Sequence, residues 1–188
     1  MIHSHAKIIV LDRDGVINQD SDEFIKSPSE WLPLPGSLEA IAKLHQAGFT
    51  IVVATNQSGV GRGLFDLKML GDIHQEMLAR VTSAGGHIAR IVFCPHRPEE
   101  HCDCRKPAPG MLYEIAESTG CGLGNMIVIG DAARDLQAAR AAGSRPILVR
   151  TGKGRATETA LAPDELIEVY DDLAAAAEAL IGEAGIRK

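Results

Sequence analysis

The chain has 188 residues, of which 45% are hydrophobic and 23% are charged, a mixture that is typical of globular proteins and excludes a chain too polar to fold. The 19 Lys and Arg residues against 25 Asp and Glu residues give a formal net charge of −6, which disfavours nucleic acid and anionic membranes as partners because both attract basic surfaces. At this length we expect a single domain that covers residues 1–188.

Short apolar runs alternate with amphipathic segments along the chain. The apolar runs predict buried strands at residues 7–11, 49–54, 88–93, 125–129 and 146–149. Segments whose apolar residues recur on one helical face predict helices at residues 37–47, 66–84, 110–119, 132–142 and 174–181. Strand–helix–strand units at this spacing form right-handed crossovers. The predicted fold class is therefore α/β, a doubly wound open parallel sheet with helices on both faces.

Two connections are long and carry no helical pattern. Residues 12–36 follow the first strand and residues 95–109 follow the third, and each is too short to form a domain with its own core. We therefore expect loops that shape a site, an open crevice and no cap domain. No apolar run approaches the ~18 residues of a membrane span, and the first residues do not have the pattern of a signal peptide. The expectation is a cytoplasmic monomer.

Polar residues follow four of the predicted strands or the loops after them. In chain order they are Asp12, Asp14, Thr55, Lys106 and Asp131. Because the carboxyl ends of parallel strands meet at one edge of a sheet, these side chains should converge on one crevice. Taken singly, each signal has an ordinary alternative, namely a solvated turn, a surface lysine or a helix N-cap. Two carboxylates as close as Asp12 and Asp14 favour a bound cation, which suits a metal-bound nucleophile beside a proton donor.

In this order the four motifs resemble those of the haloacid dehalogenase (HAD) superfamily, whose phosphatases use an aspartate nucleophile. The resemblance covers about residues 7–150. It implies that Asp12 attacks phosphorus and forms an aspartyl-phosphate. Asp14 would protonate the departing sugar oxygen and later deprotonate the hydrolytic water.

The same resemblance implies a catalytic Mg²⁺ ion. It would be held by Asp12, Asp131 and Asp14, the last through its backbone carbonyl, together with a phosphate oxygen. Thr55 and Lys106 would neutralise the phosphate oxygens during transfer. One helical turn after Asp131, Asp135 is expected to hold either the loop or the lysine.

Three of the four cysteines are clustered beside histidines in the loop after the third strand. Cysteine and histidine ligands in Cys-x-His and Cys-x-Cys pairs suit tetrahedral Zn²⁺, and the four residues concerned are Cys94, His96, Cys102 and Cys104. Four protein ligands leave no open position, so the zinc would be structural, in a loop at residues 94–104 that positions Arg105 and Lys106. Incidental thiols, or His101 in place of His96, are the alternatives. Cys121 is expected to serve packing.

The chain resembles a particular family within this superfamily, because its zinc loop leads into Arg-Lys-Pro and it is expected to have no cap domain. These are the D-glycero-D-manno-heptose 1,7-bisphosphate 7-phosphatases, which help to make the heptose of the lipopolysaccharide inner core. The motifs concerned are residues 11–18, 55–59, 61–63, 102–107 and 130–137. Two departures are Ala132, where the family often carries Ser, and a zinc hairpin that is shorter than in some members.

The resemblance implies a phosphorylated sugar as the partner. We assign Asn56, Gln57 and Asp20 to substrate binding, and Arg105 with Arg62 to the second phosphate or the sugar. Loop geometry near residues 20–26 and 97–105 would set the preferred anomer. Trp31 is expected to pack the loop of residues 20–36, with a wall for the sugar as the alternative.

Three other functions stay open from the sequence. Histidinol-phosphate phosphatases share the fold, the carboxylates and a similar zinc loop, so only a comparison of substrates separates them from sugar bisphosphatases. A phosphatase acting on nucleic-acid ends is disfavoured by the acidic net charge and by the lack of a basic, aromatic track. A non-catalytic, zinc-stabilised interaction module is disfavoured because every expected reactive residue is present.

Overall fold

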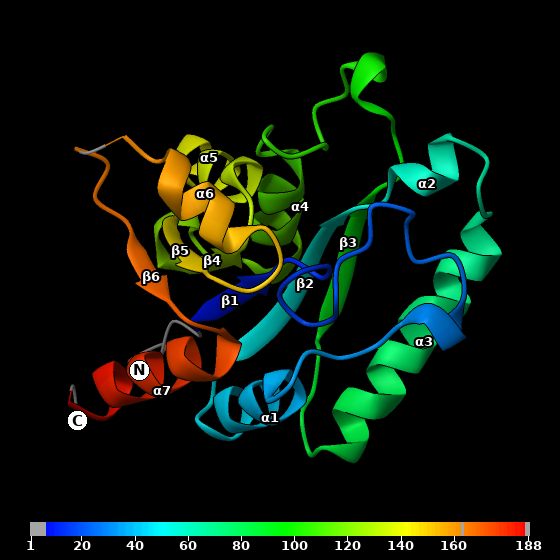
Figure 1. Ribbon diagram of the computed structural model, residues 1–188. Helices are drawn as coiled ribbons and strands as arrows, with labels where there is room; N and C mark the ends of the chain where they lie inside the picture. Colours follow the sequence, from blue (N-terminus) through cyan, green and yellow to red (C-terminus); the bar gives the residue numbers. More distant parts are fainter. Residues whose placement is uncertain (1–6, 163, 187–188) are drawn as a thin grey trace.

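A computed structural model describes residues 7–162 and 164–186. Its centre is a parallel sheet of six strands in the order β3-β2-β1-β4-β5-β6 (Figure 1). The strands are β1 Ile8–Leu11, β2 Thr50–Asn56, β3 Arg90–Cys94, β4 Met126–Gly130, β5 Arg145–Val149 and β6 Glu168–Tyr170. This order, with β1 in the interior and the chain winding outward on both sides, is that of a doubly wound sheet.

Helices cover both faces of this sheet. They are α1 Ser37–Gln46, α2 Ser58–Gly61, α3 Leu67–Ser83, α4 Gly110–Thr119, α5 Ala133–Ala142, α6 Gly154–Ala160 and α7 Leu173–Ile186. Figure 1 shows α1, α3 and α7 on one side of the sheet and α4 and α5 on the other. Three short 3₁₀ helices lie in the connections, at Pro28–Glu30, Pro98–Glu100 and Leu123–Asn125.

The core is divided between the two faces because successive side chains of a strand point in opposite directions. Ile9 and Leu11 pack in the cluster that contains α1, α3 and α7, whereas Ile8 and Val10 pack in the cluster that contains α4 and α5. All four side chains are buried. A strand that is apolar on both faces is what the continuous run at this position predicts.

The register of the central strands aligns their carboxyl ends. Leu11, the last residue of β1, pairs with Val53 of β2 and with Ile129 of β4. The residues that follow therefore leave the sheet at one edge, and Asp12 still donates its backbone N–H to the carbonyl of Ile129 at 3.0 Å.

The predicted fold class is confirmed, and each predicted strand and helix is present with its ends shifted by a few residues. β6, α2 and α6 were not predicted, because they are short and have no clear periodic pattern. Within the described residues, no separate cap domain covers the edge of the sheet at which the strands end. None of the helices described combines the length and the apolar character that a membrane crossing requires.

Trp31 is wholly buried in the core cluster that contains α1 and α3. The guanidinium carbon of Arg80 lies 5.9 Å from the centre of its ring. Trp31 therefore packs the long loop after β1 against the core, as expected, and the alternative of a wall for the sugar is wrong.

Candidate active site

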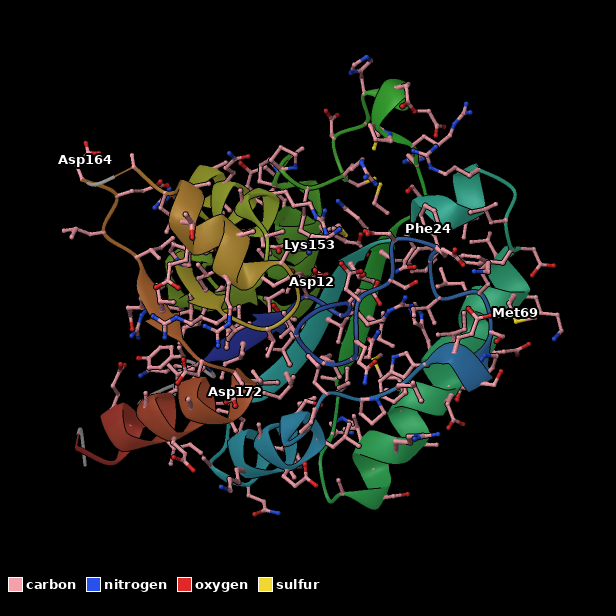
Figure 2. All side chains as sticks on the ribbon, in the orientation of Figure 1. Asp12, Phe24, Met69, Lys153, Asp164 and Asp172 are labelled. Atoms are coloured by element: carbon pink, nitrogen blue, oxygen red, sulfur yellow. The ribbon has the colours of Figure 1, made fainter. Side chains whose placement is uncertain are left out.

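Four polar side chains predicted from the strand ends are buried at the same edge of the sheet. Asp12, Thr55, Lys106 and Asp131 are each no more than 4% exposed. The Nζ atom of Lys106 lies 3.0 Å from Oδ1 of Asp12, although the two residues are 94 positions apart in the chain. Figure 2 places Asp12 in the middle of the molecule, where the strands end. Lysine and aspartate side chains are rarely buried unless they are paired, so this contact sets the two residues apart from the charged residues of the surface.

Lys106 is held in place from several directions. Its Nζ lies 2.6 Å from Oδ1 of Asp135 and donates to the carbonyl of Ala54 at 2.8 Å. The side-chain amide of Asn56 brackets the backbone of Lys106, accepting from its N–H at 3.1 Å and donating to its carbonyl at 3.0 Å. Burial alone would lower the pKa of Lys106, but the carboxylates of Asp12 and Asp135 outweigh burial and raise it. The lysine is therefore a fixed positive charge.

Asp135 has both of the roles that its position suggested. One carboxylate oxygen pairs with Lys106, and the other accepts the backbone N–H of Ala132 at 3.0 Å at the start of α5. Gly130 packs directly against it, because a Cβ atom at Gly130 would lie 2.2 Å from the Cβ of Asp135. Asp135 thus ties the first turn of α5 to the lysine.

Three carboxylates form an acidic cluster beside this lysine. Oxygen atoms of Asp12, Asp131 and Asp135 all lie within 4.8 Å of one another. Burial raises the pKa of Asp12 to about 6, and burial together with the charge of Asp12 raises the pKa of Asp131 to about 7. Three carboxylates thus cluster with one lysine, which contacts Asp12 and Asp135. A divalent cation would favour the ionised carboxylates.

The cluster also contains an acceptor that no donor satisfies. Oδ2 of Asp131 accepts the backbone N–H of Lys153 at 2.7 Å, whereas Oδ1 is buried without a hydrogen-bond partner among the described residues. Because Asp135 is engaged by Lys106 and Ala132, the oxygens of Asp12 and Asp131 are the ones better placed to bind a metal. An all-oxygen donor set of this kind fits Mg²⁺.

Two glycines hold Asp131 closely. A Cβ atom at either Gly15 or Gly152 would lie 2.2 Å from Oδ2 of Asp131, and the backbone of Gly15 has a φ of +84°. The hydroxyl of Thr151 donates to the carbonyl of Gly15 at 2.6 Å and joins the two segments. Residues 151–153 therefore pack around a candidate metal ligand, and nothing in the local sequence reveals this.

Asp14 lies outside the acidic cluster and is held by other partners. Nε and Nη2 of Arg13 donate to its two oxygens, each at 3.0 Å, and the side chains of Asn18 and Gln57 donate at 2.8 and 2.9 Å. Burial would raise the pKa of Asp14, but the Arg13 guanidinium and these hydrogen bonds lower it. Gln57 also donates to Thr55 at 2.9 Å, so it connects the two side chains. Metal ligation by the backbone carbonyl of Asp14 stays a prediction.

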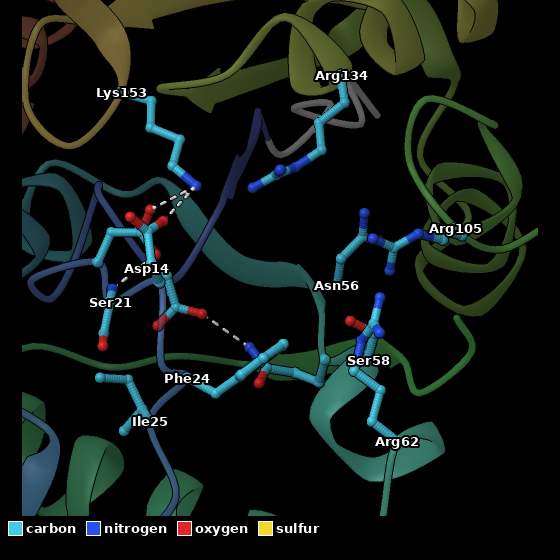
Figure 3. A pocket seen from close by; sticks show the side chains of 13 residues that line it. Asp14, Ser21, Phe24, Ile25, Asn56, Ser58, Arg62, Arg105, Arg134 and Lys153 are labelled. Carbon is cyan, nitrogen blue, oxygen red and sulfur yellow. Dashed lines mark hydrogen bonds and ion pairs between the residues drawn. The ribbon is translucent and has the colours of Figure 1, made fainter. Parts of the chain in front are cut away.

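A pocket of about 250 Å³ opens above these residues (Figure 3). It is lined by Asp14 and by all five residues predicted to bind substrate, namely Asp20, Asn56, Gln57, Arg62 and Arg105. Sequence analysis missed two cations in its wall, Arg134 and Lys153. Lys153 Nζ lies 3.2 Å from an oxygen of Asp20 and 3.5 Å from one of Asp22. A polar pocket with both signs of charge suits a ligand that carries hydroxyls and phosphate.

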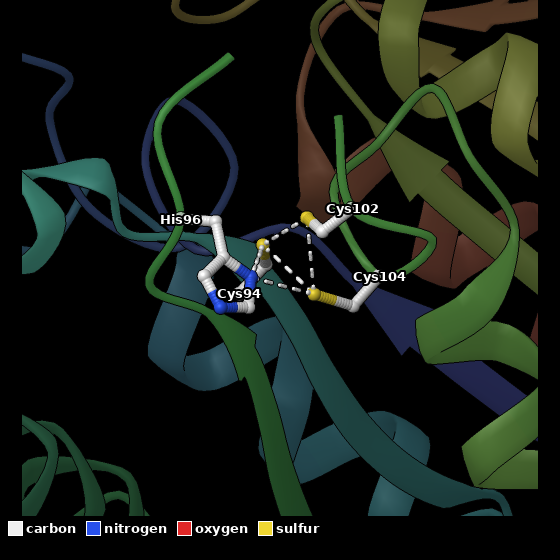
Figure 4. Close-up of side chains that lie close together, drawn as sticks. All are labelled: Cys94, His96, Cys102 and Cys104. Carbon is white, nitrogen blue, oxygen red and sulfur yellow. Dashed lines mark hydrogen bonds between the residues drawn. The ribbon is translucent and has the colours of Figure 1, made fainter. Parts of the chain in front are cut away.

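The predicted thiol cluster is present in the loop after β3. Ligand atoms of Cys94, His96, Cys102 and Cys104 lie within 4.8 Å of one another, with His96 contributing Nδ1 (Figure 4). The three sulfur–sulfur distances are 3.0, 3.4 and 3.5 Å. Tetrahedral Zn²⁺ with Zn–S bonds of about 2.3 Å places its sulfurs about 3.8 Å apart, so the three sulfurs would move outward, each pair by less than about 1 Å, to reach that geometry. His101 is not a member of the cluster.

This loop leads directly into the active site. Arg105 follows Cys104, and its Nη1 donates to the carbonyl of His96 at 3.1 Å while its side chain lines the pocket. Lys106 follows Arg105, and its Nζ lies 3.0 Å from Oδ1 of Asp12. The thiol cluster therefore holds the segment that carries Arg105, a cation of the pocket, and Lys106, the cation beside Asp12.

The fold and this site define the chain as a HAD-like hydrolase. The HAD-hydrolase-like family model matches residues 103–176. A relative from Bordetella bronchiseptica, D-glycero-beta-D-manno-heptose-1,7-bisphosphate 7-phosphatase, is 53% identical over 178 residues, which cover 95% of this chain and 99% of the relative. A relative of the same name from Pseudomonas aeruginosa is 51% identical over 174 residues, which cover 93% of this chain and 97% of the relative.

The structural comparison agrees with these relatives. The crystal structure of D,D-heptose 1,7-bisphosphate phosphatase from B. bronchiseptica, complexed with magnesium and phosphate, matches with a TM-score of 0.91 and 52% identity over 94% of this chain and 99% of that one. The chain therefore belongs to the family of D-glycero-beta-D-manno-heptose-1,7-bisphosphate 7-phosphatases, within the HAD superfamily.

Proposed function

We propose that this protein removes the 7-phosphate from D-glycero-D-manno-heptose 1,7-bisphosphate, through an aspartyl-phosphate on Asp12. The observation that carries the proposal is the contact of Lys106 with Asp12 inside a buried acidic cluster. Asp14, two residues after Asp12, and Arg105, directly before Lys106, line a polar pocket. This product would serve the synthesis of the heptose of the lipopolysaccharide inner core.

Asp12 is the nucleophile in this proposal. An oxygen of its carboxylate attacks phosphorus, and the bond from phosphorus to the sugar oxygen breaks. Lys106, fixed by Asp135 and Asn56, neutralises phosphate oxygens as charge develops on them. The hydroxyl of Thr55 accepts a hydrogen bond from Gln57, so its own proton is free to point to the phosphate.

Asp14 moves the proton in both steps. Its carboxylate lines the pocket, where the departing sugar oxygen and the incoming water would lie. The partners Arg13, Asn18 and Gln57 favour the ionised form, which accepts a proton from water in the second step. A bound phosphate brings negative charge close to Asp14 and favours the protonated form, which the first step requires.

Mg²⁺ would be held by Asp12 and Asp131, and when bound it supplies positive charge that offsets the carboxylates and the phosphate. The buried, unpartnered Oδ1 of Asp131 supports this assignment. Zn²⁺ would occupy the cluster of three cysteines and His96 and would be structural, because four protein ligands leave no open position.

The pocket would hold the sugar and the second phosphate. Arg62 and Arg105, which line the pocket, suit a phosphate, and Asp20, which also lines it, suits sugar hydroxyls. Location in the cytoplasm, a single-domain monomer and the absence of nucleic-acid or membrane partners remain predictions.

Phosphate release tests the function. With Mg²⁺, the purified protein should hydrolyse the heptose bisphosphate in preference to histidinol phosphate. Asp12→Asn should abolish turnover while the thermal unfolding midpoint changes little. Asp72→Asn, an exposed substitution in the Lys68–Asp72 pair, is the matched control and should retain full activity. Preference for histidinol phosphate would overturn the substrate, and an active Asp12→Asn variant would overturn the nucleophile.

A further inference from the structure

Arg134 is a cation of the pocket that the proposed mechanism does not use. It is the second residue of α5, directly before Asp135, and its side chain lines the pocket. Figure 3 shows its guanidinium reaching into the pocket toward the end of the Lys153 side chain, while Arg62 and Arg105 approach from a different wall. The neighbouring Asp135 contacts Lys106, which in turn contacts Asp12. Arg134 therefore enters the pocket from the first turn of α5, the same turn whose Asp135 contacts Lys106.

The position of Arg134 is unfavourable unless an anion binds there. Among the described residues, no carboxylate lies within 4.0 Å of its guanidinium, and its Nε atom is buried without a hydrogen-bond partner. It also lies in the first turn of α5, where the positive end of the helix dipole opposes a cation. An unmet buried donor destabilises a protein unless something else satisfies it.

The charges around Arg134 indicate where that anion would lie. Burial would lower the pKa of Arg134, but Asp12, Asp135 and Asp131 outweigh burial and raise it, with Asp12 as the strongest of the three. Lys153 is close enough for Arg134 to oppose its charge, and Lys153 is already paired with Asp20. Two cations, Arg134 and Lys153, thus approach each other in the pocket (Figure 3), and among the described residues only Lys153 has a carboxylate partner.

We infer that Arg134 binds the phosphate group that is transferred, together with Lys106 and on the side of that group that faces the pocket. The inference rests on the proposed function. The guanidinium of Arg134 would donate hydrogen bonds to phosphate oxygens of the substrate and then to those of the inorganic phosphate product. Arg62 and Arg105 remain for the phosphate that stays on the sugar.

Binding of inorganic phosphate tests the inference without turnover. Calorimetric titration of the protein with phosphate, in the presence of Mg²⁺, should give a Kd at least about 10-fold higher for Arg134→Gln than for the unsubstituted protein, as expected when a hydrogen bond between charged groups is lost. Arg134→Lys should give an intermediate Kd, because it keeps the charge but loses the forked donor geometry. Arg140→Gln is the control, since Arg140 lies on the same helix and pairs with Glu165 away from the pocket.

Two esters then identify which phosphate is bound. For Arg134→Gln, kcat/KM should fall by the same factor on heptose 1,7-bisphosphate and on heptose 7-phosphate, because both carry the transferred group. A fall on the bisphosphate alone, or an unchanged Kd for phosphate, would overturn the inference. If Arg134→Gln does not fold, Arg134→Lys serves for the same comparison. Protein that hydrolyses neither ester would contradict the proposed function and the inference with it, whereas hydrolysis of both esters by a variant whose Kd for phosphate is unchanged would overturn the inference alone.

Discussion

Replacing Gly15 with alanine tests how closely the turn after β1 packs on Asp131. Gly15 has a φ of +84°, and a Cβ atom there would lie 2.2 Å from Oδ2 and 2.6 Å from Cγ of Asp131. An alanine in a left-handed conformation costs about 1–2 kcal/mol. Forcing an extra carbon into a packed site typically costs a further 1–3 kcal/mol. Gly15→Ala should therefore lower the free energy of unfolding by roughly 2–5 kcal/mol in total.

Gly48→Ala separates the two contributions. Gly48 has a φ of +89°, but nothing lies within 4 Å of the position of its Cβ, so this substitution carries only the backbone cost. The difference between the two variants, about 2 kcal/mol, should appear as a midpoint roughly 4–8 °C lower for Gly15→Ala in thermal unfolding.

Mg²⁺ should widen this gap. In Gly15→Ala, displacement of the Asp131 carboxylate should raise the Kd for Mg²⁺ by about 10-fold or more in calorimetric titration. A more weakly bound ligand stabilises the folded state less. Gly48→Ala should bind Mg²⁺ as the unsubstituted protein does. Equal loss of stability in both variants, with unchanged Mg²⁺ affinity, would refute the close packing described here.

Two other predictions concern a buried histidine and the thiol cluster. Burial, with a contribution from Arg13, lowers the pKa of His74 to about 4, so the unfolded chain takes up its proton first and this residue destabilises the fold as the pH falls from about 6.5 toward 4. In urea unfolding, the free energy of unfolding of His74→Leu should therefore fall by about 2 kcal/mol less than that of the unsubstituted protein between pH 7 and pH 4.5. Equal losses would contradict the lowered pKa of His74. Removing zinc with a chelator should reduce phosphatase activity and stability together, because Arg105 and Lys106 follow Cys104 directly, and zinc should restore both; activity that survives complete loss of zinc would show that the loop holds its shape without metal.

Most of the candidate active site could be predicted from the sequence because strand ends carry a strong positional signal. Asp12, Thr55 and Asp131 each follow an apolar run, and in a parallel sheet such positions converge whatever the loops do. The thiol cluster was predictable for a related reason, since closely spaced ligands can meet within one loop.

The residues that were missed depend on contacts between distant segments. Arg134 and Lys153 reach the pocket only through the orientation of α5 and of the loop after β5, and neither carries a motif that predicts this. Gly15 and Gly152 matter because both pack on Asp131, and that contact exists only once the sheet has formed. The strand β6 has three half-buried residues and so has no run of apolar residues to reveal it.

The position of α7 has a consequence for how the chain acquires its structure during synthesis. α7 packs on α1, β5 and β6, and its residues Leu173, Ala176, Ala177 and Leu180 complete the core on one face of the sheet. Every residue of the candidate active site is translated before this helix exists. Until residues 173–180 leave the ribosome, the apolar side chains that α7 covers remain in contact with water, and such transient exposure promotes aggregation. We therefore expect the nascent chain to depend on chaperones until its last helix docks.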